Sequence, residues 1–163
     1  MNKKLIVING TMGVGKSSVS SKLSKKLENS ILLDGDWCWM MNPWKVTEEN
    51  IKMVEENITF LLNQFLENST FDYIIFTWVM QEESIWQCLV KKLETEDTSV
   101  FRFSLMCESE ELTRRMKGDR RSEEVINESL KRISIYENQD TIKIDTTNME
   151  ICDIVKEIKT KVC

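Results

Sequence analysis

Histidine is absent from all 163 residues, and this absence excludes every mechanism that depends on an imidazole group. A Ser-His-Asp triad, a Cys-His pair and the common histidine-containing zinc sites are therefore ruled out. Proline occurs once and glycine five times, so the chain contains little material typical of linkers. The chemistry of this protein must come from carboxylates, lysine, arginine, main-chain amides and an added metal ion.

Long hydrophobic runs are also lacking. The first apolar run, residues 5–8, is too short for a membrane span or for the core of a secretion signal. The five cysteines are widely spaced and form no CxxC pair, which is typical of proteins in a reducing compartment. From the length we expect one domain over residues 1–163, located in the cytoplasm and without a membrane partner.

The charge balance is acidic, with 27 Asp and Glu against 22 Lys and Arg and a net charge of −5. Proteins that bind nucleic acid in general carry an excess of positive charge, so we expect no nucleic-acid partner. Because the net charge is negative, any phosphate-binding site must be formed by a small group of suitable residues. The composition leaves open whether the protein is a monomer or a homodimer.

Short apolar segments alternate with longer amphipathic ones, a pattern that predicts an α/β protein with a mostly parallel sheet. Most of the apolar segments carry hydrophobic residues at consecutive positions, as strands covered on both faces do. Thr47 and Ser122 each precede two glutamates and are expected to cap helices. The predicted strands are 4–9, 30–34, 71–79, 99–106 and 141–145, and the predicted helices are 16–27, 46–67, 82–93, 108–116, 122–138 and 149–161.

Residues 10–17, GTMGVGKS, match the phosphate-binding pattern G-x-x-x-x-G-K-[ST] between a predicted strand and a predicted helix. Glycines let the main chain turn tightly and direct its amides at phosphate, and the helix N-terminus adds its positive dipole end. Lys16 would lie along the β- and γ-phosphates, and the Ser17 hydroxyl would bind Mg²⁺. A glycine-rich turn without a ligand is the alternative. The predicted nucleotide-binding residues here are Gly10, Thr11, Met12, Gly13, Val14, Gly15, Lys16, Ser17 and Ser18.

Two carboxylates, Asp34 and Asp36, follow the second predicted strand and are separated by one glycine. Open α/β sheets bind ligands at the carboxyl ends of their strands, so this pair should face the phosphate loop. We expect Asp34 to bind the metal together with Ser17, and Asp36 to act as the base toward an acceptor hydroxyl. The alternative is an Asp-Gly turn that only ends the strand.

The sequence resembles the small P-loop kinases, which include shikimate, gluconate and adenylyl-sulfate kinases, nucleoside monophosphate kinases and antibiotic phosphotransferases, and an AAA-type P-loop NTPase domain. The segments that carry this resemblance are GTMGVGKS, LLDGD, FSLMCESEELTRRM, LTRRMKGDRR and IDTTN. It implies a three-layer α/β/α P-loop NTPase fold, a five-stranded parallel sheet of order 2-3-1-4-5 and a short lid at about 117–122. It also implies ATP and Mg²⁺ as cofactors and an acceptor-binding region at about 35–68.

All six arginines lie from Arg102 onward. The resemblance implies that arginines around the lid contact the triphosphate, one of them stacking on adenine. Arg115 and Arg120 are the candidates for catalysis, and Arg114 and Arg121 the candidates for nucleotide binding. Which member of each pair points inward stays open. The alternative is a solvated charged face whose arginines pair with neighbouring glutamates.

The chain also departs from these relatives. Thr77 stands where a Walker B carboxylate is often found, and residues 36–101 contain no arginine. An acceptor that carries phosphate or carboxylate usually requires a guanidinium group, so nucleoside monophosphates are disfavoured. The stretch 37–44 instead supplies three tryptophans, which fit either an acceptor site or the core.

Together these features predict an ATP- and Mg²⁺-dependent kinase that transfers the γ-phosphate to a hydroxyl of a small neutral or cationic molecule, such as a metabolite, nucleoside or antibiotic. Two alternatives remain. One is a nucleoside monophosphate kinase with the same fold. The other is a regulatory module that binds nucleotide and hydrolyses it slowly.

Overall fold

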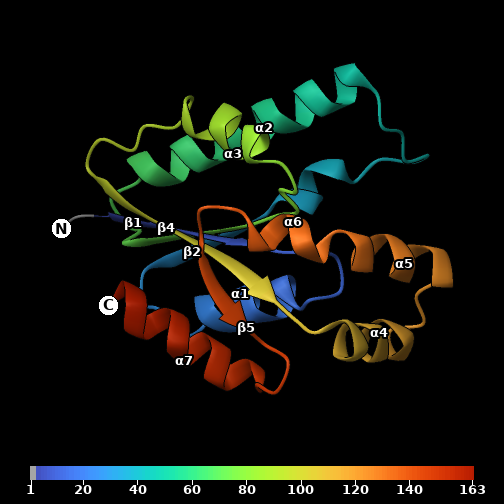
Figure 1. The fold of residues 1–163 in the computed structure, drawn as a ribbon. Coiled ribbons are helices and arrows are strands. Elements are labelled where there is room, and N and C mark those ends of the chain that lie inside the picture. The colour runs from blue at the N-terminus through green and yellow to red at the C-terminus, as the bar shows by residue number, and fades with distance from the viewer. Residues whose placement is uncertain (1–2) are drawn as a thin grey trace.

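The computed structural model describes residues 3–163, and at its centre is a parallel sheet of five strands. The strand order is β2-β3-β1-β4-β5, and every pair of neighbours is parallel, as predicted. Figure 1 shows helices on both faces of this sheet. The strands are β1 (Lys3–Asn9), β2 (Ser30–Asp34), β3 (Tyr73–Thr77), β4 (Thr98–Met106) and β5 (Ile142–Asp145).

Two predicted helix caps are confirmed: the Thr47 side chain accepts from the Asn50 amide, and Ser122 accepts from the Val125 amide. The predicted helix 122–138 is wrong as one element, because it breaks at Arg132 into two short helices. The helices are α1 (Lys16–Ser24), the 3₁₀ helix η1 (Gly35–Trp39), α2 (Glu48–Glu67), α3 (Glu83–Val90), α4 (Ser109–Gly118), α5 (Glu123–Lys131), α6 (Ile133–Glu137) and α7 (Ile151–Val162).

The break at Arg132 has a tertiary cause. Helix α5 packs against α4 and brings the Ser129 carbonyl to the phosphate loop, whereas α6 contacts β4 and buries Tyr136. A straight helix cannot satisfy both contacts. The amphipathic pattern of the sequence therefore predicted helical conformation correctly but not the change of direction.

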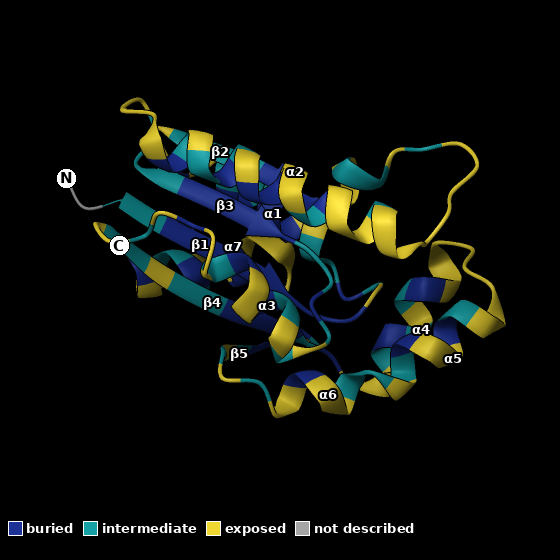
Figure 2. Cartoon of the chain, turned by 90° about the horizontal axis from the view of Figure 1, so that it is seen from above, coloured by how far each residue is buried: buried dark blue, intermediate teal, exposed yellow. Residues whose placement is uncertain are grey.

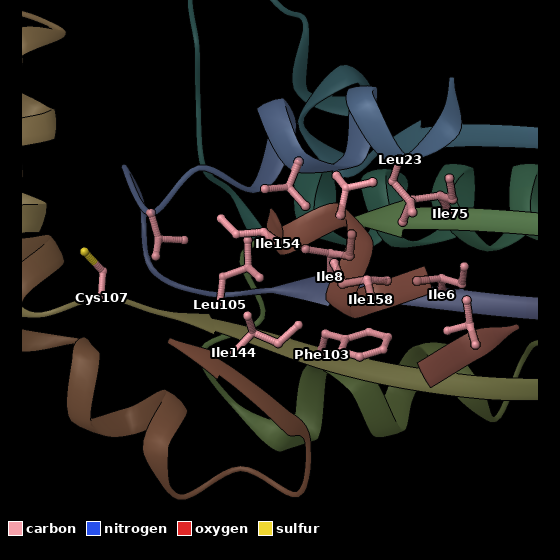
Figure 3. Close-up of a cluster of buried hydrophobic side chains, with 14 of the residues drawn as sticks. Ile6, Ile8, Leu23, Ile75, Phe103, Leu105, Cys107, Ile144, Ile154 and Ile158 are labelled. Atoms are coloured by element: carbon pink, nitrogen blue, oxygen red, sulfur yellow. The ribbon is translucent and has the colours of Figure 1, made fainter. Parts of the chain in front are cut away.

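The sheet separates two hydrophobic layers, and β1 contributes to both. Leu5 and Val7 pack in the cluster under α2 and α3, whereas Ile6 and Ile8 pack in the cluster under α1 and α7. Figure 3 shows the second cluster, where side chains of β1 and β4 lie beside those of α7. Burying one such side chain stabilises the fold by about 1.5–3 kcal/mol, so the central strand is held firmly from both faces.

The loops that follow the carboxyl ends of the strands lie at one end of the molecule. In both Figure 1 and Figure 2, the segment between η1 and α2 and the α4–α5 pair extend from this same end. Figure 2 also shows that the strands are mostly buried while the outer helix faces are exposed. Across residues 3–163, no helix is both long enough and apolar enough to cross a membrane.

Candidate phosphate- and metal-binding site

The loop between β1 and α1 has the backbone conformation that only glycine adopts readily. Gly10, Gly13 and Gly15 have φ values of 144°, 83° and 105°. A Cβ atom at Gly13 would lie 2.5 Å from Cγ of Met116, and one at Gly10 would lie 2.8 Å from the Leu105 carbonyl oxygen. Conformation therefore requires glycine at all three positions, and space requires it as well at Gly10 and Gly13, which supports the interpretation of residues 10–17 as a phosphate loop.

The phosphate loop is fastened to its surroundings through side chains that the structure buries. The Thr11 hydroxyl donates to the Ser129 carbonyl at 2.9 Å, which joins the loop to α5. Val14 is almost fully buried, whereas Met12 is exposed. Thr11 and Val14 therefore serve the shape of the loop, and main-chain amides remain the groups suited to phosphate.

Asn9, the last residue of β1, is a functional position that the sequence analysis missed. Its side chain is buried and accepts hydrogen bonds from the amides of Gly10 (2.9 Å) and Met80 (2.8 Å). It also donates to the Met80 carbonyl at 2.8 Å and to the Gln139 side chain at 2.9 Å. Asn9 thus fixes the start of the phosphate loop to the β3–α3 connection. The sequence does contain a signal for this role, because Asn9 is a polar residue at the end of an otherwise apolar strand.

Lys16 begins α1, and its ammonium group donates to the Thr11 carbonyl at 3.0 Å across the phosphate loop. Burial lowers the pKa of Lys16 from 10.5 to about 8, and the nearby carboxylates of Asp36 and Asp34 oppose this change. A lysine in this position is poorly solvated and has few anionic partners. Phosphate oxygens at the loop would supply the missing negative charge.

Ser17 and Asp34 meet directly. The Ser17 hydroxyl donates to Oδ2 of Asp34 at 2.9 Å, and Oδ1 of Asp34 accepts from the Asp36 amide at 3.1 Å. A hydroxyl and a carboxylate are oxygen ligands of the kind that Mg²⁺ prefers when phosphate oxygens and water complete its shell. The residues present therefore fit Mg²⁺. Within residues 3–163 no cluster of three acidic or cysteine side chains is suited to a metal ion, so nucleotide oxygens would be needed.

The end of β3 does not add a carboxylate to this pair. Thr77 is buried, and its hydroxyl donates to the Ile8 carbonyl at 3.2 Å. The side chain therefore ties β3 to β1 and points its only polar atom at the main chain. Asp34 alone occupies the acidic position expected beside Ser17.

Asp36 lies in η1, two residues beyond Asp34, and the residue as a whole is exposed. Its carboxyl group is only partly shielded from water; this partial burial and the charge of Asp34 raise the pKa of Asp36, against the opposing effects of Lys16 and a hydrogen bond from Trp78. A raised pKa makes a carboxylate a better proton acceptor. Gly35 lies directly on the Trp78 indole, because a Cβ atom there would come within 2.5 Å of its ring.

Arg115 lies beside the phosphate loop and is extensively bonded. Its guanidinium donates to the Thr146 carbonyl at 2.7 Å and hydroxyl at 3.1 Å, and to the Val14 carbonyl at 3.4 Å. It also pairs with Glu111 at 2.8 Å, and its side chain is 22% exposed. Arg115 therefore joins α4, the phosphate loop and the β5–α7 loop. A catalytic contribution by Arg115 stays a prediction.

The other three candidate arginines are more exposed. Arg114 pairs with Glu111 at 2.6 Å and its side chain is 73% exposed. Arg120 has a φ of 57°, in the left-handed region that few side chains favour, and Arg121 follows it. The amides of Arg120 and Arg121 donate to the carbonyls of Lys117 and Met116, each at 3.0 Å, which closes the end of α4. The predicted lid, 117–122, is this helix end and the turn that leads to α5.

A cleft of about 580 Å³ lies between the phosphate loop, α4 and the β5–α7 loop. Its volume is in the range of small-molecule sites. Arg114 and Arg115 line it together with phosphate-loop residues, but Arg120 and Arg121 do not. The lining also contains residues 147–151, the connection from β5 into α7. The cleft is lined by Gly13, Val14, Gly15, Ser18, Val19, Glu111, Arg114, Arg115, Asp119, Thr147, Asn148, Met149, Glu150, Ile151 and Ile154.

Solved structures share this fold. The tunicamycin resistance protein of Deinococcus radiodurans superposes with a TM-score of 0.74 and 17% identity over 98% of this chain and 95% of that chain. A gluconokinase of Sinorhizobium meliloti has a TM-score of 0.71 and 16% identity over 96% and 89%. The shikimate kinase of Acinetobacter baumannii, solved with shikimate, has a TM-score of 0.64 and 17% identity over 98% and 93%. At these identities the likeness concerns the fold.

Comparison of the sequence with curated proteins gives no match. A family model described as an AAA domain matches residues 6–141, which is most of the chain and includes the phosphate loop, the Asp34–Asp36 pair and the arginine-bearing segment. The match extends over four of the five strands. The chain therefore belongs to this AAA-domain family of P-loop proteins.

Proposed function

We propose that this protein is an ATP- and Mg²⁺-dependent kinase that phosphorylates a hydroxyl group of a small neutral or cationic molecule. The observation that carries the proposal is the hydrogen bond between Ser17 and Asp34, with Asp36 two residues away and Lys16 next to Ser17. Groups whose chemistry suits phosphate binding, metal binding and proton transfer are thus within one small region. Two of the similar structures are named as kinases, a gluconokinase and a shikimate kinase, which supports the assignment.

In the proposed reaction, Lys16 and the phosphate-loop amides bind the β- and γ-phosphates. Ser17 and Asp34 would hold Mg²⁺, which supplies positive charge to the phosphate oxygens when it is bound. The acceptor oxygen forms a new bond to the γ-phosphorus while the bond from that phosphorus to the β–γ bridging oxygen breaks. The proton of the acceptor hydroxyl passes to the Asp36 carboxylate, and ADP leaves with the electron pair of the broken bond.

The direct test is coupled ADP formation by the purified protein with ATP, Mg²⁺ and a panel of hydroxyl compounds, followed by mass detection of the phosphorylated product. Asp36→Asn should reduce acceptor-dependent turnover by about 10²–10⁴-fold, since it removes the proton acceptor. Asp97→Asn is the matched control, because Asp97 is an exposed residue of the α3–β4 connection. It should retain full turnover.

Two results would redirect the assignment. Unchanged turnover in Asp36→Asn would favour a nucleotide-binding module with slow hydrolysis. Rapid phosphorylation of nucleoside monophosphates, in preference to nucleosides and sugars, would favour a nucleoside monophosphate kinase.

A further inference from the structure

Four large apolar side chains are exposed within ten consecutive residues, 37–46, here termed the aromatic loop. The exposed fractions are 57% for Trp37, 85% for Met40, 65% for Trp44 and 55% for Val46. Large side chains with this degree of exposure are not core residues. The structure thereby excludes the core interpretation for Trp37 and Trp44, whereas Trp39 packs partly on the core. The acceptor-site interpretation stays a prediction.

The base of the aromatic loop is fixed. Trp39 packs partly on the buried cluster under α2, and its ring lies 6.0 Å from that of Trp44. The Asn50 side chain of α2 donates to the Lys45 carbonyl at 3.1 Å and contacts the Met41 sulfur at 3.7 Å. These contacts hold both halves of the loop against α2, so the exposed side chains have a defined position beside η1.

The aromatic loop adjoins the proposed base. Asp36 immediately precedes Trp37, and both belong to η1. The loop and the α4–α5 pair extend from the same end of the molecule in both views (Figures 1 and 2). An acceptor whose hydroxyl reaches Asp36 would therefore lie next to the start of this loop.

The charges near the loop disfavour an anionic acceptor. Residues 36–60 contain five carboxylates against two lysines, and no arginine. One of the lysines, Lys52, lies 3.8 Å from Glu56 on the same helix. A phosphate or carboxylate on the acceptor would meet net negative charge here, whereas the rings offer flat apolar surface.

We propose that the aromatic loop binds the flat apolar face of an aryl or heteroaryl alcohol that carries no negative charge, so that this class of compound is the acceptor. The proposal rests on the kinase function proposed above and specifies its substrate. Trp37 and Trp44 are then specificity-determining residues, since they contact the acceptor away from the reacting hydroxyl. The bound compound would then cover the aromatic surface that is exposed in this structure.

The experiment compares matched probes in the ADP-formation assay: thymidine with thymidine monophosphate and deoxyribose, and 4-nitrophenyl glucoside with gluconate and glucose. We expect the two uncharged aryl compounds to have kcat/KM values at least about tenfold above those of their partners. Trp37→Ala and Trp44→Ala should lower kcat/KM for these compounds about tenfold, mainly through KM, with the KM for ATP unchanged. Trp44→Phe should retain most of the activity.

Phe60→Ala is the matched control, because Phe60 is an aromatic residue of α2 that is 65% exposed and lies outside the loop. Phe60→Ala should leave kcat, the KM for each acceptor and the KM for ATP unchanged. The inference is overturned if the anionic or aliphatic probes are preferred, or if the tryptophan variants bind the aryl probes normally. It is also overturned if sedimentation shows a dimer that Trp44→Ala dissociates, since the loop would then be an interface between copies.

The outcomes separate this inference from the proposed function. Transfer to gluconate or glucose alone keeps the kinase assignment and removes the aryl acceptor. Absence of ADP formation with every probe removes the kinase assignment. In that case, thermal stabilisation by the aryl probes that is lost in Trp37→Ala and Trp44→Ala would still support an aryl site, and its absence would remove that as well.

Discussion

The proposed nucleotide side of the site and the proposed acceptor side are built in opposite ways. Around the phosphate loop, polar side chains such as Asn9, Thr11 and Thr146 are buried and hydrogen-bonded to the main chain. On the acceptor side, Trp37 and Met40 are exposed. The first region has its geometry fixed before a ligand arrives, and the second offers apolar surface that is still uncovered.

This difference fits the two kinds of ligand that the proposed function requires. Triphosphate is recognised by main-chain amides and charge, and such groups are effective only when they are held in place. An apolar acceptor is recognised by area removed from water, which requires only that suitable rings lie near the reacting group. A rigid phosphate-loop region and an exposed aromatic loop can therefore serve the same reaction.

The largest expected effect concerns Arg120, which lies in the turn between α4 and α5 and does not line the cleft in this structure. Arg120→Gly should lower kcat about 10³-fold, since arginine at a transferring phosphate contributes about 10³–10⁵ in related chemistry. The same change should leave the thermal midpoint equal or higher, because glycine adopts the φ of 57° without strain. Turnover and thermal unfolding measured on one preparation check both parts.

Lys131→Gly, in the neighbouring helix α5, is the control and should retain turnover. Full activity of Arg120→Gly would show that this arginine does not contact phosphate.

A smaller effect is expected for the Ser17–Asp34 pair, which links the nucleotide side to the acceptor side. Ser17→Ala and Asp34→Asn should each lower turnover about 10²-fold and raise the Mg²⁺ concentration needed for half-maximal rate. Because the two side chains share a hydrogen bond of 2.9 Å, the double variant should lose less than the product of the single losses. Ser21→Ala, one turn along α1, serves as the control. Strictly multiplicative losses would mean that the pair does not act as one unit.

The rigidity of the nucleotide side can be tested through Asn9. Asn9→Ala should lower the free energy of unfolding by about 2 kcal/mol, since it leaves buried main-chain groups without partners. Asn57→Ala, at an exposed position of α2, should change it little. Urea unfolding measures both. If Asn9→Ala had the same free energy of unfolding as the unchanged protein, water would have replaced the hydrogen bonds of Asn9.

The pH dependence should distinguish the two sides through Lys16 and Asp36. Above the Lys16 pKa of about 8, kcat/KM for ATP should fall about tenfold per pH unit as the ammonium loses its proton. Stability should change in the other direction. The unfolded chain binds more protons between that pKa and 10.5, so the Lys16 contribution to the free energy of unfolding rises with pH over this window.

At acid pH, the raised pKa of Asp36 should place the loss of acceptor turnover above the ordinary value of 3.8. Lys16→Arg should lack the alkaline fall, because arginine keeps its proton. An alkaline fall that persists in Lys16→Arg would assign it to another group.

The sequence predicted those parts of the molecule that depend on local patterns. Residues 10–17 carry the phosphate loop in a continuous motif, and the strands are apolar runs with turn residues at their ends. The strand order came from the resemblance to P-loop kinases rather than from the pattern itself. The parts that were missed depend on tertiary contacts. The roles of Asn9 and Thr146 exist only because distant main-chain groups meet them, and the break at Arg132 follows from two separate packing partners.

The contact between Gly35 and Trp78 sets a limit on how this site can change. The indole fills the space where a side chain at position 35 would begin, with its nearest ring atom 2.5 Å from that point. Any larger side chain there would push the end of β3 and the turn after β2 apart. The two carboxylates on either side would be displaced together, so a variant at this position would disturb both the proposed metal binding and the proposed proton transfer. Evolution of a new acceptor preference is thus easier through the exposed rings than through the glycine that separates the two acids.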